Sequence, residues 1–493
     1  MSERLSSATL SKLPANVALP KYDRTTVTPG IVHLGVGAFH RAHQAVFTHD
    51  CLNAGETEWG IIAASLRSGD TQQALQPQDN LYCLSLRDGE GEQLRIIGAL
   101  VKTIVAPEDP AALLHALTDP AIRIVTLTVT EKGYTANLAE RTLLRDHADV
   151  VHDLANPARP RSVLGFLAEA ISRRRDVGVA PFTLLSCDNL PSNGRTLLRV
   201  LTEFASLRSP DLGAFIASNV SSPSSMVDRI VPATTDEDRA RIAAELGVED
   251  AWPVMAEPFF QWVIEDRFAT GRPQWQHSGV EFVEDVVPFE HMKLRMLNGS
   301  HTAIAAIGQI AGLETVSKAF GHPTVRNFIQ RYWAQVSPTL DPAVDGKSYS
   351  DRLTSRFDNP SLRHRTLQIA SDASQKVPQR ILEPLRELIA AHRPHEALVY
   401  AVAAWIRSCA DTNETGQPLT VNDAAFQTWS AKPDQTRTEV AAVIRQFLEF
   451  YTVFDPSWKE NEHFIRALTA ALQNIREHGI IAALDAKFGP MAA

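Results

Sequence analysis

Three polar side chains of useful chemical types lie within nine residues: Lys293, Asn298 and His301. Since an α-helix advances about 100° per residue, Lys293 and His301 share one stripe with Leu297, and Asn298 stands three residues before His301. An amine that carries a proton, an amide that donates a hydrogen bond and an imidazole that orients a substrate are what hydroxyl-to-carbonyl interconversion requires. The spacing predicts a helical face directed at a pocket; a solvated helix surface is the alternative.

A glycine-rich turn near the N-terminus would serve such a reaction by holding a dinucleotide. Residues 31–34 predict a short buried strand, and the run Gly-Val-Gly-Ala-Phe-His follows directly at 35–40. Such a turn lets a pyrophosphate approach backbone N–H groups at the start of a helix. His40 stands where the usual fingerprint has its third glycine, so the helix must pack less closely on its strand or be held differently. The expected cofactor contacts here are Gly35, Gly37, Ala38 and Phe39.

Further apolar runs predict more buried strands, with helical patterns between them. Strand and helix alternate in the order that favours a parallel, doubly wound sheet, whose strand ends hold ligands. The strand-like runs span 60–66, 122–129 and 181–186, and the helical patterns span 40–55, 162–177 and 193–218.

The character of the sequence changes near Pro288, after which long helical patterns continue to the C-terminus. We therefore expect an α/β protein with two domains. A Rossmann-like dinucleotide-binding domain would cover residues 1–287, and a mostly α-helical substrate and catalytic domain would cover residues 288–493.

The choice between NAD and NADP depends on the end of the second predicted strand. An acid there binds the ribose hydroxyls of NAD, whereas a cation accommodates the 2′-phosphate of NADP. This chain offers both, Arg67 first and Asp70 three residues later. We expect NAD, with NADP left open.

Composition excludes several classes of function. Lys and Arg number 48 against 57 Asp and Glu, a net charge of −9, and no basic block points to nucleic acid or an anionic membrane. The N-terminal residues lack an apolar signal core, and no apolar run approaches the ~18 residues of a membrane span. We expect a cytoplasmic enzyme with a small-molecule ligand, either a monomer or a small homo-oligomer.

Other catalytic devices are missing from the sequence. The four cysteines are far apart and form no CxxC pair, which disfavours zinc and fits reduced thiols. None of the tyrosines has a lysine four residues later, and there is no P-loop motif. Lys293 is therefore the best candidate for moving the proton.

Five runs, taken together and in order, resemble the polyol-specific long-chain dehydrogenases. This is the mannitol dehydrogenase family, which also includes fructuronate and tagaturonate reductases, and the resemblance covers about residues 30–480. The runs are Gly-Val-Gly-Ala-Phe-His-Arg-Ala-His at 35–43, Thr-Val-Thr-Glu-Lys-Gly-Tyr at 128–134, Ser-Cys-Asp-Asn at 186–189, Met-Val-Asp-Arg-Ile-Val-Pro at 226–232 and Lys-Leu-Arg-Met-Leu-Asn-Gly-Ser-His at 293–301.

Two further segments, 361–368 and 374–380, look most like the fructuronate reductase (mannonate oxidoreductase) branch. Typical mannitol 2-dehydrogenases carry an arginine where Gln368 stands and lack the Gln-Lys-x-Pro-Gln-Arg run. This departure counts against plain mannitol as substrate without excluding it.

The resemblance implies an N-terminal dinucleotide-binding domain, a helical C-terminal domain, a cleft between them and no metal. Carried over to matching positions, Lys293 would be the catalytic acid–base, and Asn189 and Asn298 would hold the reacting oxygen. His301 would orient the substrate or the lysine. A lysine desolvated beside a nicotinamide cation can have its pKa lowered into the working range.

Residues around this set have two interpretations each. The resemblance implies that Glu290 could gate proton exit; alternatively, it could be a favourable acid in a first helical turn. Asp228 and Arg229 could bind substrate hydroxyls, or they could be a buried pair supporting the cleft. Glu131 and Lys132 could border the nicotinamide, or they could form an ordinary ion pair.

Gln368, Lys376 and Arg380 should decide the substrate. Lys376 or Arg380 could pair with the carboxylate of a hexuronate; a surface lysine is the alternative for Lys376.

The sequence thus predicts a zinc-independent, NAD(P)-dependent oxidoreductase that interconverts a keto-hexuronate or ketose with its aldonate or alditol. Interconversion of D-fructuronate and D-mannonate is the first hypothesis, and a mannitol 2-dehydrogenase is the second. A non-catalytic dinucleotide-binding sensor is the alternative of another class.

Overall fold

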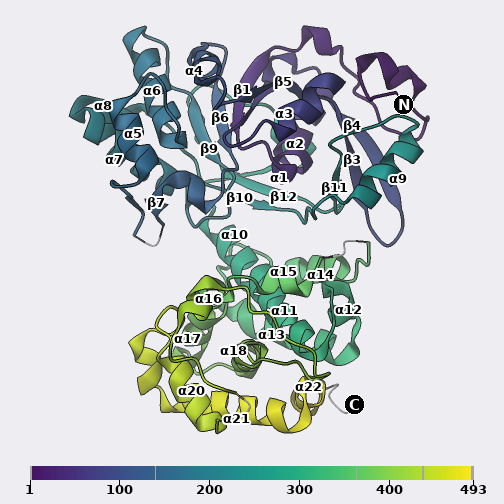
Figure 1. The fold of residues 1–493 in the computed structure, drawn as a ribbon, viewed down its shortest axis with the longest axis vertical. Coiled ribbons are helices and arrows are strands. Elements are labelled where there is room, and N and C mark those ends of the chain that lie inside the picture. Colours follow the sequence, from purple (N-terminus) through teal and green to yellow (C-terminus); the bar gives the residue numbers. More distant parts are fainter. Residues whose placement is uncertain (1–2, 139, 362–363, 436–437, 490–493) are drawn as a thin grey trace. The chain divides into compact units, whose positions relative to one another are not determined.

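The computed structural model describes residues 3–138, 140–361, 364–435 and 438–489. The chain divides into two units, Met1–Val287 and Pro288–Ala493, which are coloured purple to teal and green to yellow in Figure 1. Leu362 and Arg363, part of the run that resembles the fructuronate reductases, lie outside the described residues.

A five-stranded parallel sheet organises the N-terminal unit, in the order β5-β2-β1-β6-β9. The predicted α/β class is confirmed, and four of these strands coincide with predicted runs; β5 was not predicted. The order reverses at β1, so a ligand crevice is expected at the carboxyl ends of β1 and β6. The strands are β1 (Pro29–Leu34), β2 (Gly60–Ser65), β5 (Leu100–Val105), β6 (Ile124–Leu127) and β9 (Thr183–Ser186).

Helices cover both faces of this sheet because successive side chains of each strand point to opposite faces. Val32 and Leu34 pack against one set of helices, whereas Ile31 points to the opposite face and packs with α2. The helices on the first face are α4 (Pro110–Thr118), α6 (Val163–Asp176) and α7 (Asn193–Arg208), and α2 spans Gln44–Asn53.

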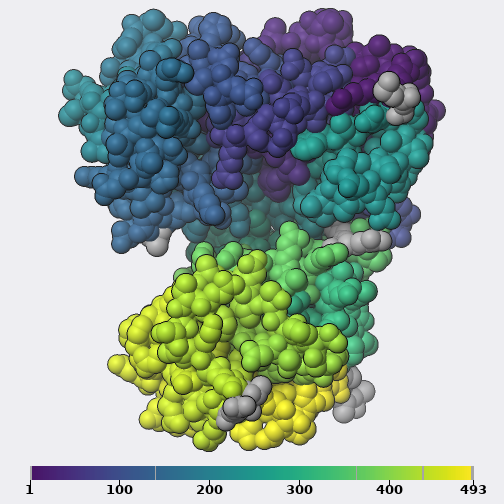
Figure 2. Space-filling model, in the orientation of Figure 1, coloured from purple at the N-terminus to yellow at the C-terminus, as the bar shows by residue number. Residues whose placement is uncertain are grey.

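A two-stranded ribbon and two three-stranded sheets complete the N-terminal unit, and none of the three was predicted. One three-stranded sheet has the order β11-β3-β4 and the other β10-β12-β13. Leu5 packs with the side chains of α9 (Asp236–Leu246), and Figure 2 shows the purple N-terminal segment against this teal helix. The strands are β3 (Tyr82–Arg87), β4 (Glu92–Ile97), β10 (Ser225–Asp228), β11 (Val254–Ala256), β12 (Gln261–Glu265) and β13 (Glu281–Val283), and a β7-β8 ribbon joins Ala136–Asn137 to Thr142–Leu143.

Two predicted helices are each split in two. The one at 40–55 becomes α1 (Ala38–Ala42) and α2, because His43 leaves the helical region at φ −129° and ψ −91°. The one at 193–218 becomes α7 and α8 (Pro210–Asn219), since Pro210 cannot donate the hydrogen bond that would continue α7. The remaining helices of this unit are α3 (Asp70–Leu75) and α5 (Ala148–Ala155).

The C-terminal unit is helical, as predicted, and its described residues form no strand apart from isolated bridges. A single apolar core joins α11, α13, α18 and α21. Two stretches, Lys293–Asn298 and Pro378–Leu382, are π-helical turns. The α-helices are α10 (Val287–Met292), α11 (Gly299–Ala311), α12 (Val316–Gly321), α13 (Pro323–Val336), α14 (Gly346–Phe357), α15 (Thr366–Ala370), α16 (Ala373–Val377), α17 (Glu383–Ala390), α18 (Glu396–Ser408), α19 (Ala424–Thr428), α20 (Val440–Leu448), α21 (Glu462–His478) and α22 (Ile480–Phe488).

Candidate active site

The glycine turn after β1 has the geometry that a pyrophosphate needs. Gly35 has φ +93°, and a Cβ there would lie 2.3 Å from the Thr128 carbonyl oxygen at the end of β6, so only glycine fits. At Gly37 a Cβ would point into open space, its nearest neighbour 3.9 Å away. The first-turn N–H groups of α1, at Ala38 and Phe39, follow at once. This turn therefore suits a bound dinucleotide.

His40 replaces the third glycine by stacking on His33. The two rings are 3.3 Å apart and nearly parallel, and both side chains are fully buried. Nδ1 of His33 bonds to Thr126 Oγ1 at 2.8 Å, and its Nε2 bonds to Thr128 Oγ1 at 3.0 Å. Burial lowers the pKa of His33 to about 3 and that of His40 well below its ordinary value. Two neutral imidazoles therefore hold α1 on the sheet.

The residues that would read the adenosine ribose lie on the loop after β2. Arg67 and Asp70 are both exposed, and Asp70 is the first residue of α3. The Asp70 carboxylate accepts a hydrogen bond from Ser68 Oγ at 2.8 Å. An acid and a cation thus both stand near this strand end, as the sequence indicated.

The loop that carries Asn189 is tied to the loop after β6 through its neighbour Asp188. The Asp188 carboxylate accepts hydrogen bonds from the Thr130 N–H at 2.8 Å and from the Tyr134 hydroxyl at 2.7 Å. Burial raises the pKa of Asp188, and these hydrogen bonds counteract the rise. Asn193 Nδ2 also donates to the Asp188 carbonyl oxygen at 2.9 Å. Asn189 is exposed at the carboxyl end of β9.

Glu131 and Lys132 lie in the same loop region, in a 3-10 turn that spans Glu131–Tyr134. Both side chains are exposed. Their position beyond the carboxyl end of β6, beside the switch point of the sheet, is compatible with the expected place near a nicotinamide.

Asp228 and Arg229 differ in their surroundings, although both are buried. Asp228 ends β10 and lies opposite Gln261 of β12. Arg229 donates from Nε to the Glu257 carbonyl at 2.9 Å and from Nη1 to the Ala42 carbonyl at 2.6 Å. Burial lowers its pKa to about 10. These contacts favour the supporting interpretation of Arg229.

The Lys293–Asn298 segment is a π turn, so the prediction of a regular α-helix there was wrong. In an α-helix two residues five apart are about 140° out of alignment. A π turn closes hydrogen bonds between such residues, as the Gly299 N–H does with the Leu294 carbonyl, and so brings positions five apart to one side. The wider turn thus places Lys293 and Asn298 on one side more directly than the predicted helix would.

Side-chain donors form hydrogen bonds with successive carbonyl groups of this π turn. Tyr332 OH donates to the Arg295 carbonyl at 3.2 Å, and Trp333 Nε1 donates to the Met296 carbonyl at 3.2 Å. The remaining donors are Ser300 Oγ to the Met296 and Leu297 carbonyls at 2.5 and 3.1 Å, Thr302 Oγ1 to the Asn298 carbonyl at 2.9 Å, and Arg380 Nη1 to the same oxygen at 3.4 Å. A wide turn is stable here because these carbonyls are satisfied.

His301 is buried among aromatic and basic groups. Its ring stacks on Phe357 at 4.7 Å and meets His364 edge-on at 5.2 Å. Burial, followed by the charges of His364, Arg356 and Arg380, lowers the pKa of His301 well below its ordinary value. Its Nε2 makes no hydrogen bond within the part of the chain that the structure describes. His301 is therefore a neutral imidazole that can exchange a hydrogen bond with a ligand.

The expected substrate-determining residues fall into two groups. Arg380 lies beside the π turn, where Nη1 is 3.2 Å from Thr302 Oγ1, and burial lowers its pKa to about 10. Lys376 donates from Nζ to the Ile369 and Ser371 carbonyls at 3.2 and 2.5 Å. Gln368 is exposed on α15, and Glu290 is half-buried on α10. The structure thus brings Arg380 together with Asn298 and His301.

The sequence did not single out His364 and Arg356, which neighbour His301, or Tyr332, which contacts the π turn. His364 lies in the Arg-His-Arg run at 363–365, whose density of basic groups was the available signal. Nothing in the sequence around Tyr332 marks it, since its role depends on a contact between segments far apart in the chain.

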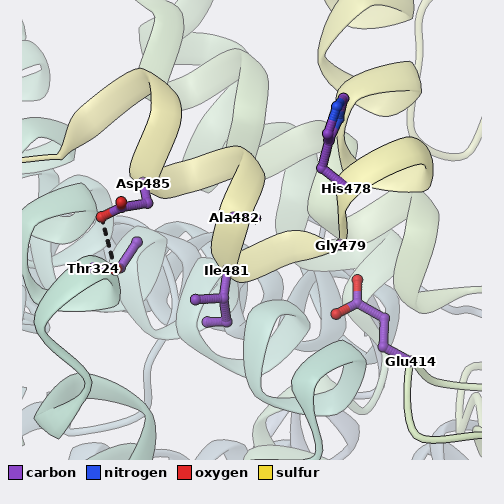
Figure 3. Close-up of a pocket in the computed structure, with 7 residues that line it drawn as sticks. All are labelled: Thr324, Glu414, His478, Gly479, Ile481, Ala482 and Asp485. Atoms are coloured by element: carbon purple, nitrogen blue, oxygen red, sulfur yellow. Dashed lines mark hydrogen bonds between the residues drawn. The ribbon is translucent and has the colours of Figure 1, made fainter.

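A surface cavity of about 410 Å³ in the C-terminal unit holds none of the predicted site residues (Figure 3). Thr324 Oγ1 donates to Asp485 at 3.1 Å across its rim. Across the described residues, neither a cluster of three or more potential metal ligands nor a helix able to cross a membrane is present. All four cysteines are free thiols.

Each of the two units matches a known protein-family domain. Residues 29–277 match the mannitol dehydrogenase Rossmann domain, and residues 285–476 match the mannitol dehydrogenase C-terminal domain. D-mannonate oxidoreductase of Escherichia coli (strain K12) is 41% identical over 480 residues, 95% of this chain and 97% of that protein. Mannitol 2-dehydrogenase of Pyrenophora tritici-repentis is 38% identical over 492 residues, 98% of this chain and 86% of that protein.

A solved structure covers the whole chain. It is the ternary complex of Pseudomonas fluorescens mannitol 2-dehydrogenase with NAD and D-mannitol, which is 34% identical and has a TM-score of 0.86 over 99% of this chain and 100% of that one.

Proposed function

Because the chain belongs to the mannitol dehydrogenase family of oxidoreductases, we propose that it is an NAD-dependent hexuronate dehydrogenase that reduces D-fructuronate to D-mannonate and catalyses the reverse reaction. The single observation that carries the substrate class is the surroundings of His301, where the charges of Arg356 and Arg380 add to burial in lowering its pKa. The third basic neighbour, His364, stays neutral because burial lowers its own pKa to about 4. A guanidinium group forms strong, charge-assisted hydrogen bonds with the carboxylate of a hexuronate, whereas a neutral polyol has no carboxylate to pair with it.

Lys293 is proposed as the proton carrier. When a ketone is reduced, its carbon takes a hydride and its oxygen takes a proton. The Lys293 ammonium would donate that proton, and the resulting neutral amine would remove it again when the alcohol is oxidised. The support is the resemblance, together with the π turn that places Lys293 and Asn298 on one side of the segment.

Asn298 and Asn189 are proposed to bind the reacting oxygen. An amide N–H stabilises developing negative charge without titrating, and such a donor typically contributes a few kcal/mol to the barrier. His301 would orient a neighbouring hydroxyl group through Nε2, which is buried and available.

NAD is proposed to bind the glycine turn, where it would supply the hydride or accept it. Gly35, Gly37 and the first-turn N–H groups of α1 would hold its pyrophosphate. Asp70, at the start of α3, would bind the ribose hydroxyls, which is the arrangement expected for NAD. Arg67 could accommodate the 2′-phosphate of NADP, so NADP stays the alternative cofactor.

Mannitol 2-dehydrogenase activity is the second candidate. Its support is that mannitol 2-dehydrogenases are among the relatives and that one of them covers the whole chain in structure. The basic surroundings of His301 and the replacement of arginine by Gln368 count against it.

A substrate panel tests the proposal. The protein is mixed with NADH or NADPH and with D-fructuronate, D-tagaturonate or D-fructose, and cofactor absorbance at equal substrate concentrations gives kcat/KM. We expect NADH oxidation with D-fructuronate and a kcat/KM at least about tenfold above that for D-fructose, about 1.4 kcal/mol in the transition state. Preference for D-fructose would favour the second candidate. NADH binding without oxidation by any ketose would favour a non-catalytic sensor.

A further inference from the structure

A tyrosine hydroxyl joins the two π turns of the C-terminal unit. Tyr332 on α13 is fully buried, and its hydroxyl lies 3.2 Å from the Arg295 carbonyl of the first turn and 3.3 Å from the Arg380 carbonyl of the second. One phenolic proton is thus shared between two carbonyl oxygens. Few other side chains could reach both, because the group must be long, rigid and a donor.

Both π turns depend on local sequence. The second begins at Pro378, which has no N–H for the preceding turn and crowds that turn with its ring. At the end of this π turn, the Glu383 N–H donates to the Pro378 carbonyl. The first ends at Gly299, where a Cβ would lie 2.1 Å from the Tyr332 hydroxyl and 3.0 Å from the Arg380 carbonyl. Gly299 has φ −64°, so its backbone does not require glycine. Its missing side chain is what lets the hydroxyl approach.

We propose that Tyr332 is a positioning residue: its hydroxyl locks the first π turn to the second and so fixes Lys293 and Asn298 relative to Arg380. This inference rests on the proposed function, in which the amine and the amide act on the reacting oxygen and Arg380 holds the carboxylate. A displacement of about 1 Å in such a group costs up to about 100-fold in rate. Tyr332 would therefore affect catalysis without touching substrate.

Tyr332→Phe removes the hydroxyl and keeps the ring. Tyr400→Phe is the matched control, because Tyr400 is also buried in this unit but its hydroxyl accepts a hydrogen bond from Asn474 at 3.0 Å and meets neither π turn. We expect Tyr332→Phe to lower kcat for D-fructuronate by about 10-fold or more, with NADH affinity unchanged. We expect Tyr400→Phe to retain the wild-type kcat.

The pH profile of kcat separates positioning from general loss of stability. At pH 7 and above, where we expect stability to be nearly independent of pH, a smaller fraction of folded enzyme lowers kcat equally at every pH. A displaced amine instead changes the pH at which the proton is transferred. We expect the half-maximal pH of Tyr332→Phe to shift by about 0.5 unit or more.

Gly299→Ala tests the same contact from the other side. Its Cβ would push the hydroxyl away, so this variant should also lose kcat. In the double variant with Tyr332→Phe the hydroxyl is absent, and the nearest ring carbon, Tyr332 Cζ, is 3.1 Å from the new Cβ. We expect the two losses not to multiply, because both remove one interaction.

Wild-type activity decides which proposal has failed. If the wild-type protein reduces no keto-hexuronate, the proposed function fails. If the wild type is active and Tyr332→Phe keeps kcat within about twofold and the same pH profile, the positioning inference is wrong. Losses that multiply in the double variant would also overturn it. Should Gly299→Ala fail to fold, the Tyr332→Phe comparison still decides.

Discussion

His301 and Arg380, which come from two separate sequence runs, divide two tasks at the candidate site. Burial, and after it the neighbouring basic groups, lowers the pKa of His301 well below the ordinary value, so the ring stays neutral at physiological pH. A neutral imidazole orients hydroxyl groups but contributes no positive charge. Arg380 stays charged, because burial lowers its pKa only to about 10. In the proposed function, recognition of a carboxylate therefore falls to Arg380.

Arg380→Gln should change substrate preference more than overall activity. Hydrogen bonds to a charged partner contribute about 1.5–3 kcal/mol, so kcat/KM for D-fructuronate should fall by about 10- to 100-fold. D-fructose has no carboxylate, so its kcat/KM should change much less. Steady-state kinetics with both ketoses measures the two effects. An equal loss for both would show that Arg380 supports the fold of the site and does not select the substrate.

At the scale of elements, two kinds of turn carry the site. The turn after β1 and the π turn before α11 both bring backbone atoms unusually close to a neighbour, and each has a glycine at the contact. The sequence showed the first turn directly, because Gly-x-Gly after an apolar run has a known geometry. It could not show the second, because Gly299 permits the π turn locally but the contact that uses its missing side chain comes from the distant Tyr332.

Gly35→Ala and Gly37→Ala should have different effects although they are two residues apart. At Gly35 an added Cβ meets the Thr128 carbonyl at 2.3 Å with φ at +93°, so the free energy of unfolding should fall by about 2 kcal/mol or more. At Gly37 the Cβ enters open space, so stability should be unchanged while NADH affinity drops about tenfold or more. Thermal melts and NADH fluorescence titration measure both. Unchanged NADH binding in Gly37→Ala would show that the cofactor does not bind at this turn.

At the scale of the whole molecule, the sequence predicted the broad organisation well and the smaller sheets not at all. The five-stranded sheet could be recognised because buried parallel strands are continuous apolar runs. The strands β3 and β4 form a local hairpin and were missed because their side chains mix polar with apolar types. The strand β10 was missed because its partner, β12, lies well along the chain. His40 illustrates the same limit: only the fold shows that it stacks on His33.

Both units bury histidines that stay neutral, which makes the folded chain sensitive to acid. Burial lowers the pKa of His33 and His49 to about 3 and of His364 to about 4, and lowers those of His40 and His301 well below the ordinary value. In the unfolded chain these side chains take up protons near pH 6.5. Below that pH the unfolded state therefore binds more protons than the folded state, and the free energy of unfolding falls as pH falls.

Melting temperatures between pH 8 and pH 5 check this expectation. The melting temperature should be nearly constant from pH 8 to 7 and should decrease below about pH 6.5, each histidine contributing at most about 1.4 kcal/mol per pH unit. The raised carboxyl pKa values of Asp188 and Asp250 act in the opposite direction and offset part of the loss. A melting temperature that stays level or rises down to pH 5 would contradict the assignment of neutral buried histidines.

The role of Lys293 as proton carrier is tested by Lys293→Ala, assayed with NADH and D-fructuronate. The exposed-lysine variant Lys318→Ala is the control. Lys318 lies on α12 of the same unit and pairs with Glu314 at 3.5 Å. We expect Lys293→Ala to bind NADH but to lose kcat by at least about 100-fold, because the substitution removes the proton carrier. We expect Lys318→Ala to keep wild-type turnover. Near-normal turnover in Lys293→Ala would contradict the account and assign the proton to another group.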